Sequence, residues 1–98
     1  MTQTILLGDY EIHYAPTDQF ALIMHHLIRG YDAVRLDAAA ANELGVLLHT
    51  NQKRIRELGG YQVMCGAAGD LTLYGPGGQR ACYFTPDQTL ILAQLLDG

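Results

Sequence analysis

Large apolar and polar side chains alternate close to the N-terminus, beside a short turn. Residues 10–14 read Tyr-Glu-Ile-His-Tyr, and a second apolar run, residues 5–7, precedes the turn signal Gly8-Asp9. A period of two is typical of a strand with one buried face. The pattern predicts a β-hairpin over residues 5–14, which Ala15-Pro16 ends because proline cannot continue a paired strand.

The following stretch predicts a helix that runs to Arg29, with Gly30 directly after it. Thr17 or Asp18 can cap its first turn, and large apolar residues recur at helical spacing from position 20 to position 27. The apolar run of residues 20–24 is also compatible with a fully buried strand, because periodicity does not separate a short buried strand from a buried helix.

A long helix is predicted in the middle of the chain. Residues 33–36 predict a short strand, and Asp37 then stands at the N-cap of a helix from Ala38 to about Leu58, where Gly59-Gly60 would end it. Six residues of this helix are three or four positions apart, the spacing of a heptad repeat: Ala41, Leu44, Leu48, Asn51, Ile55 and Leu58.

The heptad stripe packs either on the protein's own sheet or on a partner helix, where Asn51 would favour one register. A helix of about 21 residues is about 31 Å long, whereas a strand of about five residues spans about 17 Å. One end of the helix is therefore expected to overhang the sheet. We expect self-packing for residues 41–48, and for residues 55–58 we expect a partner to cover the surface.

Three strands and a final helix are predicted in the C-terminal half. Glycine-rich turns separate the strands of an antiparallel meander, expected at residues 61–65, 71–74 and 80–84. Thr85 can cap the last helix, Pro86 suits its first position, and Gln88 completes a capping box. This helix is predicted from Pro86 to Leu96.

The sequence also contains a weak internal repeat. Shifting it by 48 positions aligns residues 33–37 with 81–85, and three leucines of the middle helix with three of the last helix. A shift of 69 aligns Tyr14 with Tyr83, and a shift of 61 aligns Gly8-Asp9 with Gly69-Asp70. These shifts indicate three units, each a strand followed by a capped helix that can lie on the sheet.

Length and composition make the chain a single globular domain over residues 1–98. It has 98 residues, 49% of them hydrophobic and 16% charged, which is enough apolar material for one core. The predicted class is α+β: an antiparallel or mixed sheet of about five or six short strands, with three helices packed mainly on one face. The element order is expected to be β-β-α-β-α-β-β-β-α.

The net charge and the N-terminal sequence indicate which classes of partner and which cell compartment are expected. A formal net charge of −4 argues against a general nucleic-acid coat and against attraction to anionic membranes. The N-terminus lacks the basic segment of a signal peptide, and no run approaches the length of a membrane helix. The sequence thus favours a cytoplasmic protein with no membrane partner, in which nucleic-acid binding is unlikely.

Candidate chemistry is sparse. The chain has no serine, which excludes a serine triad, and Cys65 and Cys82 match no zinc spacing and are expected to be small buried residues. His25 and His26 are neighbours, so on a helix they would point about 100° apart and could not clasp one ion. We predict no catalytic residue, no metal and no cofactor.

The favoured function is non-enzymatic: a small acidic protein that binds another protein as a regulator, adaptor or inhibitor. An inhibitor encoded by a phage or mobile element would fit this size and charge. The chain is expected to form a homodimer, because pairing of two helix overhangs would bury their apolar surface. The candidate partner-binding residues are Asn51, Lys53, Arg54, Ile55, Arg56, Leu58 and Tyr74.

Two other functions stay open. One is a small-ligand-binding or catalytic domain that uses His25, His26 or Cys65 in a pocket between sheet and helices. The other is a nucleic-acid-binding regulator in which the basic cluster Lys53, Arg54 and Arg56 contacts phosphate.

Overall fold

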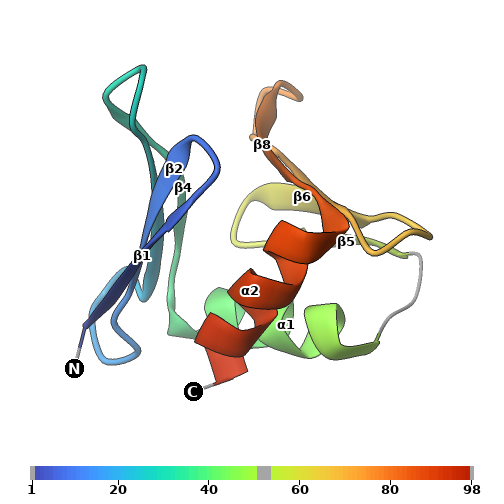
Figure 1. Ribbon diagram of the computed structural model, residues 1–98, viewed down its shortest axis with the longest axis horizontal. Helices are drawn as coiled ribbons and strands as arrows, with labels where there is room; N and C mark the ends of the chain where they lie inside the picture. The colour runs from blue at the N-terminus through green and yellow to red at the C-terminus, as the bar shows by residue number, and fades with distance from the viewer. Residues whose placement is uncertain (1, 51–53, 98) are drawn as a thin grey trace.

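The computed structural model describes residues 2–50 and 54–97 and shows two four-stranded antiparallel sheets with two helices (Figure 1). The N-terminal sheet has the order β1-β2-β3-β4 and the C-terminal sheet the order β5-β6-β7-β8. The elements are β1 Gln3–Leu7, β2 Tyr10–Tyr14, β3 Leu22–His26, β4 Tyr31–Leu36, α1 Ala38–Thr50, β5 Arg54–Leu58, β6 Tyr61–Cys65, β7 Leu71–Tyr74, β8 Arg80–Phe84 and α2 Pro86–Asp97.

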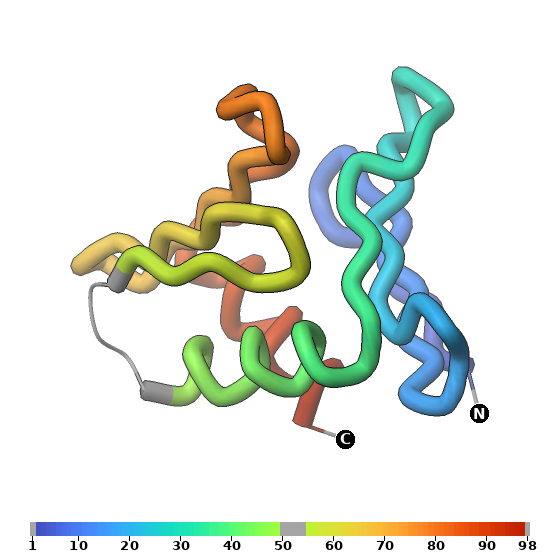
Figure 2. Tube along the Cα trace, turned by 180° about the vertical axis from the view of Figure 1, so that it is seen from behind, coloured from blue at the N-terminus to red at the C-terminus, as the bar shows by residue number. Residues whose placement is uncertain are grey.

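The α+β class is confirmed, but the arrangement of its elements differs from the prediction. Two helices are present in the described residues instead of three, and two sheets replace the single sheet of five or six strands. Figures 1 and 2 show the two sheets standing side by side and splaying apart at the end away from the helices. The two helices lie at the opposite end, between the sheets.

The predicted helix over residues 17–29 is wrong, because the middle of this stretch forms the strand β3. Leu22 and Met24 are fully buried, and their strand pairs with β2 on one side and with β4 on the other. A central strand obtains backbone hydrogen bonds from both neighbours, and this long-range pairing outweighs the local helical spacing. The alternative of a buried strand near residues 20–24 was the better interpretation of this run.

The long helix ends at Thr50, eight residues before the predicted end, and residues 54–58 form β5. The heptad stripe is therefore not continuous, and no overhang carries Ile55 and Leu58 beyond a sheet. Gly59 and Gly60 form the turn between β5 and β6, with φ of 57° and 88°. Two consecutive positive φ values suit a tight hairpin turn. The two glycines that were expected to end a helix therefore form the turn at which the chain reverses direction between two strands.

The chain consists of two units with the same order of elements, four strands followed by one helix. Details recur within them: the two sheets have a register shift at corresponding places, after Met24 and after Leu73. Gly8 and Gly59 stand in the first hairpin of each unit with φ of 62° and 57°. The shift of 48 positions therefore matches β4 and α1 with β8 and α2, the earlier details correspond at 49 and 51 positions, and the units number two rather than three.

The helix caps are equivalent as well. Asp37 Oδ1 accepts a 2.9 Å hydrogen bond from the amide of Ala40, and Thr85 Oγ1 accepts a 3.3 Å bond from the amide of Gln88. The Gln88 side chain returns a bond of 3.0 Å from the Thr85 amide to its Oε1. The predicted capping box is confirmed.

The buried side chains of both sheets and both helices form one cluster. The largest include Phe84, Ile12, Leu22, Met24, Leu36, Leu44, Leu71, Leu73 and Leu92. The helices approach closely at Gly45, where a Cβ atom would lie 3.3 Å from the Cβ of Leu96. Glycine permits this close crossing, because an added Cβ would require Leu96 or the helices to shift by a few tenths of an ångström.

Candidate interaction surface and cleft

The outer face of the C-terminal sheet carries an apolar row that crosses all four strands. Its members lie directly opposite one another in the strand register: Ile55, Met64, Thr72 and Tyr83. Ile55 is 61% exposed and Tyr83 is 41% exposed, whereas the small Thr72 between the larger side chains is 9% exposed. The row starts on β5, an edge strand that pairs with another strand of the described residues on one side only.

The corresponding row of the N-terminal sheet is mostly polar. It consists of Thr4, His13, Ile23 and Arg35. Thr4 Oγ1 lies 3.2 Å from His13 Nδ1, and His13 Nε2 lies 2.7 Å from Glu11 Oε1. On the same face, Asp32 contacts His25 at 2.9 Å and Arg35 at 3.3 Å. The two units thus share a backbone plan, but only the C-terminal sheet presents an apolar outer row.

The predicted partner-binding residues separate in the structure. Ile55 and Tyr74 lie on the outer face of the C-terminal sheet, Tyr74 in the row beside the apolar row, opposite Gln62. Arg54 begins β5, and Arg56 is exposed on the same strand.

Leu58 cannot serve as a partner contact, because it is 3% exposed and belongs to the core. It follows Ile55 by three positions, which places two helical residues on one face but two strand residues on opposite faces. Asn51 and Lys53 lie outside the described residues.

Two tyrosines join the sheets across the gap between β4 and β8. The hydroxyl of Tyr10 donates to the carbonyl oxygen of Ala81 on β8 at 3.0 Å, and the hydroxyl of Tyr61 accepts from the amide of Arg35 on β4 at 3.2 Å. Tyr10 and Tyr61 occupy the same place in the two units, so each unit sends one tyrosine to the edge strand of the other. Such reciprocal contacts are the geometry of a two-fold interface, here built within one chain.

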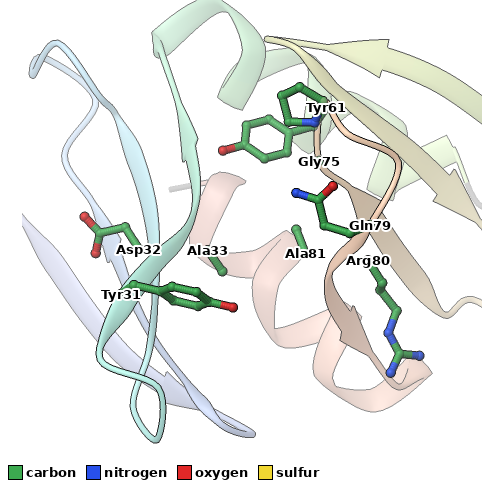
Figure 3. A pocket seen from close by; sticks show the side chains of 9 residues that line it. Tyr31, Asp32, Ala33, Tyr61, Gly75, Gln79, Arg80 and Ala81 are labelled. Atoms are coloured by element: carbon green, nitrogen blue, oxygen red, sulfur yellow. The ribbon is translucent and has the colours of Figure 1, made fainter.

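An open cleft lies beside these tyrosines, and we call it the inter-sheet cleft. One part, of about 370 Å³, is lined by Asp9, Tyr10, His26, Arg29, Tyr31, Arg80, Ala81, Cys82 and Tyr83. The adjoining part, of about 210 Å³, adds Asp32, Ala33, Tyr61, Gly75, Pro76 and Gln79 and shares Tyr31, Arg80 and Ala81. Figure 3 shows Tyr31 and Ala33 on one wall, and Gln79, Arg80 and Ala81 on the other.

Comparisons of the chain with protein-family models, with curated proteins and with solved structures found no match. The two features that can indicate a function are the apolar row on the C-terminal sheet and the inter-sheet cleft.

Sequence reasoning missed Arg29, Tyr31 and Arg80 as candidate site residues. They are far apart in the sequence and carry no common motif. Only the meeting of the β3–β4 turn with β8 brings them to one cleft. The tyrosine content did suggest an interface, but the pattern could not show which rings converge.

The histidines do not assemble a metal site. His25 and His13 lie on the outer face of the N-terminal sheet, each beside a carboxylate, while His26 faces the inter-sheet cleft. His26 makes edge-on ring contacts with Tyr10 and Tyr31, with centroids 5.0 and 6.1 Å apart. Within residues 2–50 and 54–97, no group of three or more His, Cys, Asp or Glu side chains could hold a metal ion.

Both cysteines are buried thiols, and Cys82 lines the same part of the cleft as His26. Cys65 is buried in the core at 8% exposure, and Cys82 at 2% has its Sγ 3.8 Å from the Sδ of Met24. Burial raises the pKa of Cys82 to about 12, because the interior disfavours the thiolate. A thiol held in this state is a poor nucleophile at neutral pH.

We expect Cys82 to resist thiol reagents in the native protein. At pH 8 the raised pKa reduces its thiolate fraction roughly a thousandfold relative to an exposed thiol, and burial limits access further. The measurement is the rate of modification by a disulfide reagent in Cys65→Ala, which leaves one thiol, with and without denaturing urea. Equal rates in both conditions would show that the thiol is accessible in the native fold.

Proposed function

We propose that this protein works by protein–protein binding, and that the outer face of the C-terminal sheet binds a second copy of the chain. The observation that carries the proposal is the apolar row Ile55, Met64, Thr72 and Tyr83. Exposed apolar patches with a polar rim are typical of interaction sites on soluble proteins, and methionine and tyrosine are enriched there.

The rim of this face supports the same interpretation. The adjacent outer row holds Glu57, Gln62, Tyr74 and Arg80, which are charged, polar or amphipathic side chains. A two-fold arrangement would place one apolar row against its copy and leave these side chains at the margin, as in a sandwich of two sheets about 10 Å apart. Ile55 and Tyr83 are the exposed large hydrophobic side chains of this row, far fewer than the roughly 20–30 residues per partner of a standard interface, so we expect a weak, concentration-dependent dimer.

The matched outer face within the same chain strengthens the argument. The equivalent positions in the N-terminal sheet satisfy one another by hydrogen bonds and ion pairs, and so have no comparable need of a partner. No helix among the described residues combines the length and apolar character that a membrane crossing requires. A role as a regulator or inhibitor, and a cytoplasmic location, stay predictions from the sequence.

Ile55→Lys is expected to abolish self-association. A lysine at this position would bring a charge into the interface, while at an edge strand of the monomer it remains solvated. Multi-angle light scattering across a concentration series should show a mass that rises above the 10.7 kDa of one chain for the unmodified protein and stays at that value for the variant.

Leu6→Lys is the matched control. Leu6 is 70% exposed on the outer face of β1, the edge strand of the other sheet, where it lies opposite Glu11. This variant should associate like the unmodified protein, and circular dichroism should show both variants folded. An unmodified chain that remains monomeric at the highest concentration, or equal loss of association in both variants, would contradict the proposed surface.

A further inference from the structure

The inter-sheet cleft contains two cations that the fold does not neutralise. Arg29 lies in the β3–β4 turn and Arg80 begins β8, and both line the larger part of the cleft. Neither guanidinium forms an ion pair with a carboxylate of the described residues; Arg29 Nη1 donates to the hydroxyl of Tyr31 at 3.4 Å. Since a guanidinium has five N–H donors, most of the donors in this pair are free for a ligand.

An aromatic ring stands beside Arg29 and lines the same cleft as Arg80. Tyr31 is 52% exposed and belongs to both parts of the cleft, and its ring is nearly perpendicular to that of His26. Figure 3 shows its ring projecting from β4 toward the wall formed by β8. An exposed ring of this kind offers a face on which a planar group of a ligand can stack.

The two halves of the cleft have different chemistry although their backbones correspond. Tyr10 and Tyr61, which join the sheets, are the same residue in both units. In contrast, the positions of His26 and Tyr31 in the first unit correspond to Gly75 and Gln79 in the second. The rings and Arg29 therefore gather in one half, which makes the cleft asymmetric and suits a ligand with two distinct ends.

We propose that the larger half of the inter-sheet cleft binds a ribonucleoside monophosphate. Arg29 and Arg80 would hold the phosphate by charge-assisted hydrogen bonds, and Tyr31 would stack on the base. Asp9, the one carboxylate lining this half, would accept hydrogen bonds from the ribose hydroxyls. The volume of about 370 Å³ lies within the usual range for sites that bind small molecules.

Calorimetric titration of the full chain tests the site with defined probes: the four ribonucleoside monophosphates, the matching nucleosides and inorganic phosphate. At least one monophosphate should bind with a Kd below about 1 mM, and at least tenfold tighter than its nucleoside and than phosphate alone. The double variant Arg29→Gln with Arg80→Gln should lower that affinity at least tenfold. Tyr31→Leu should lower the affinity for the monophosphate and leave the weak affinity for inorganic phosphate unchanged.

Arg56→Gln is the control, because it removes one exposed cation from β5, outside the cleft. It should bind the monophosphate like the unmodified chain, and circular dichroism should show every variant folded. Several results would overturn the proposal: no saturable binding of any monophosphate, equal affinity for nucleoside and monophosphate, or equal loss in Arg56→Gln. Binding of a single-stranded oligonucleotide without binding of any monophosphate would overturn it as well. Tyr83 belongs both to the apolar row and to the cleft lining, so the titrations are made at a concentration at which light scattering gives the mass of one chain, and Ile55→Lys tests self-association separately.

Discussion

Leu58→Asp is expected to unfold the protein, whereas Ile55→Asp, three positions earlier on the same strand, should leave the fold intact. Leu58 is 3% exposed among the core side chains, and the turn that follows it packs against Leu36 and Ala40. An aspartate there would bury a carboxylate without a partner, which costs at least about 4 kcal/mol. A domain of this size has a total stability of about 5–15 kcal/mol, so much of it would be lost.

Ile55→Asp provides the internal comparison. Its side chain is 61% exposed on the outer face, so the charge stays solvated and the free energy of unfolding should change by less than about 1 kcal/mol. Urea unfolding followed by circular dichroism measures both variants. If the two substitutions destabilise the protein equally, β5 does not present alternate residues to the core and to the outside, and the strand assignment is wrong.

The second large effect is expected at Phe84, where the core meets the joint between the two units. Phe84 is fully buried, and its ring lies edge-on to that of Tyr10 with centroids 5.5 Å apart. Phe84→Ala would remove these contacts and leave a cavity, at a cost of about 3–5 kcal/mol. Because Tyr10 also bonds to the backbone of β8, the loss should loosen the contact between the sheets.

The repeat of the two units supplies a graded control for this prediction. Leu36 ends β4 as Phe84 ends β8, so a leucine already fits this place in the unit. Phe84→Leu should therefore destabilise the protein by less than Phe84→Ala, and Tyr83→Ala, at a partly exposed position, by less than either. The unfolding midpoint in urea is the measurement. A Phe84→Ala variant as stable as Tyr83→Ala would show that this ring does not fill the core.

The elements predicted correctly have signals that are local in the sequence. The hairpin over residues 5–14 follows from the alternation of residues 10–14 and the apolar run of residues 5–7 on either side of Gly8-Asp9, and the last helix from the cap at Thr85 and Gln88. These signals act between residues a few positions apart, so no distant partner is needed to interpret them.

The elements predicted wrongly have ambiguous local patterns. β3 is a strand because β2 and β4 pair with its two sides, and β5 pairs with β6 across Gly59-Gly60, a turn that was interpreted as the end of a helix. At β5, Ile55 lies seven positions after Leu48 and Leu58 three positions after Ile55, and this spacing resembled a heptad repeat that continued past the end of the helix. Ile55 was nevertheless placed correctly on the outside, for the wrong reason: it belongs to a sheet face rather than to a helix overhang.

The sequence by itself determined the α+β class, most strand positions, both helix caps and the burial of the two cysteines, because turn residues, caps and alternation depend on neighbouring positions. Only the tertiary structure decided that the strands divide into two sheets, that an apolar row crosses one of them, and that Arg29, Tyr31 and Arg80 meet in a cleft. Strand pairing and the packing of one unit on the other are contacts between residues far apart in the chain. Their energies depend on which surfaces meet, and no local pattern specifies that.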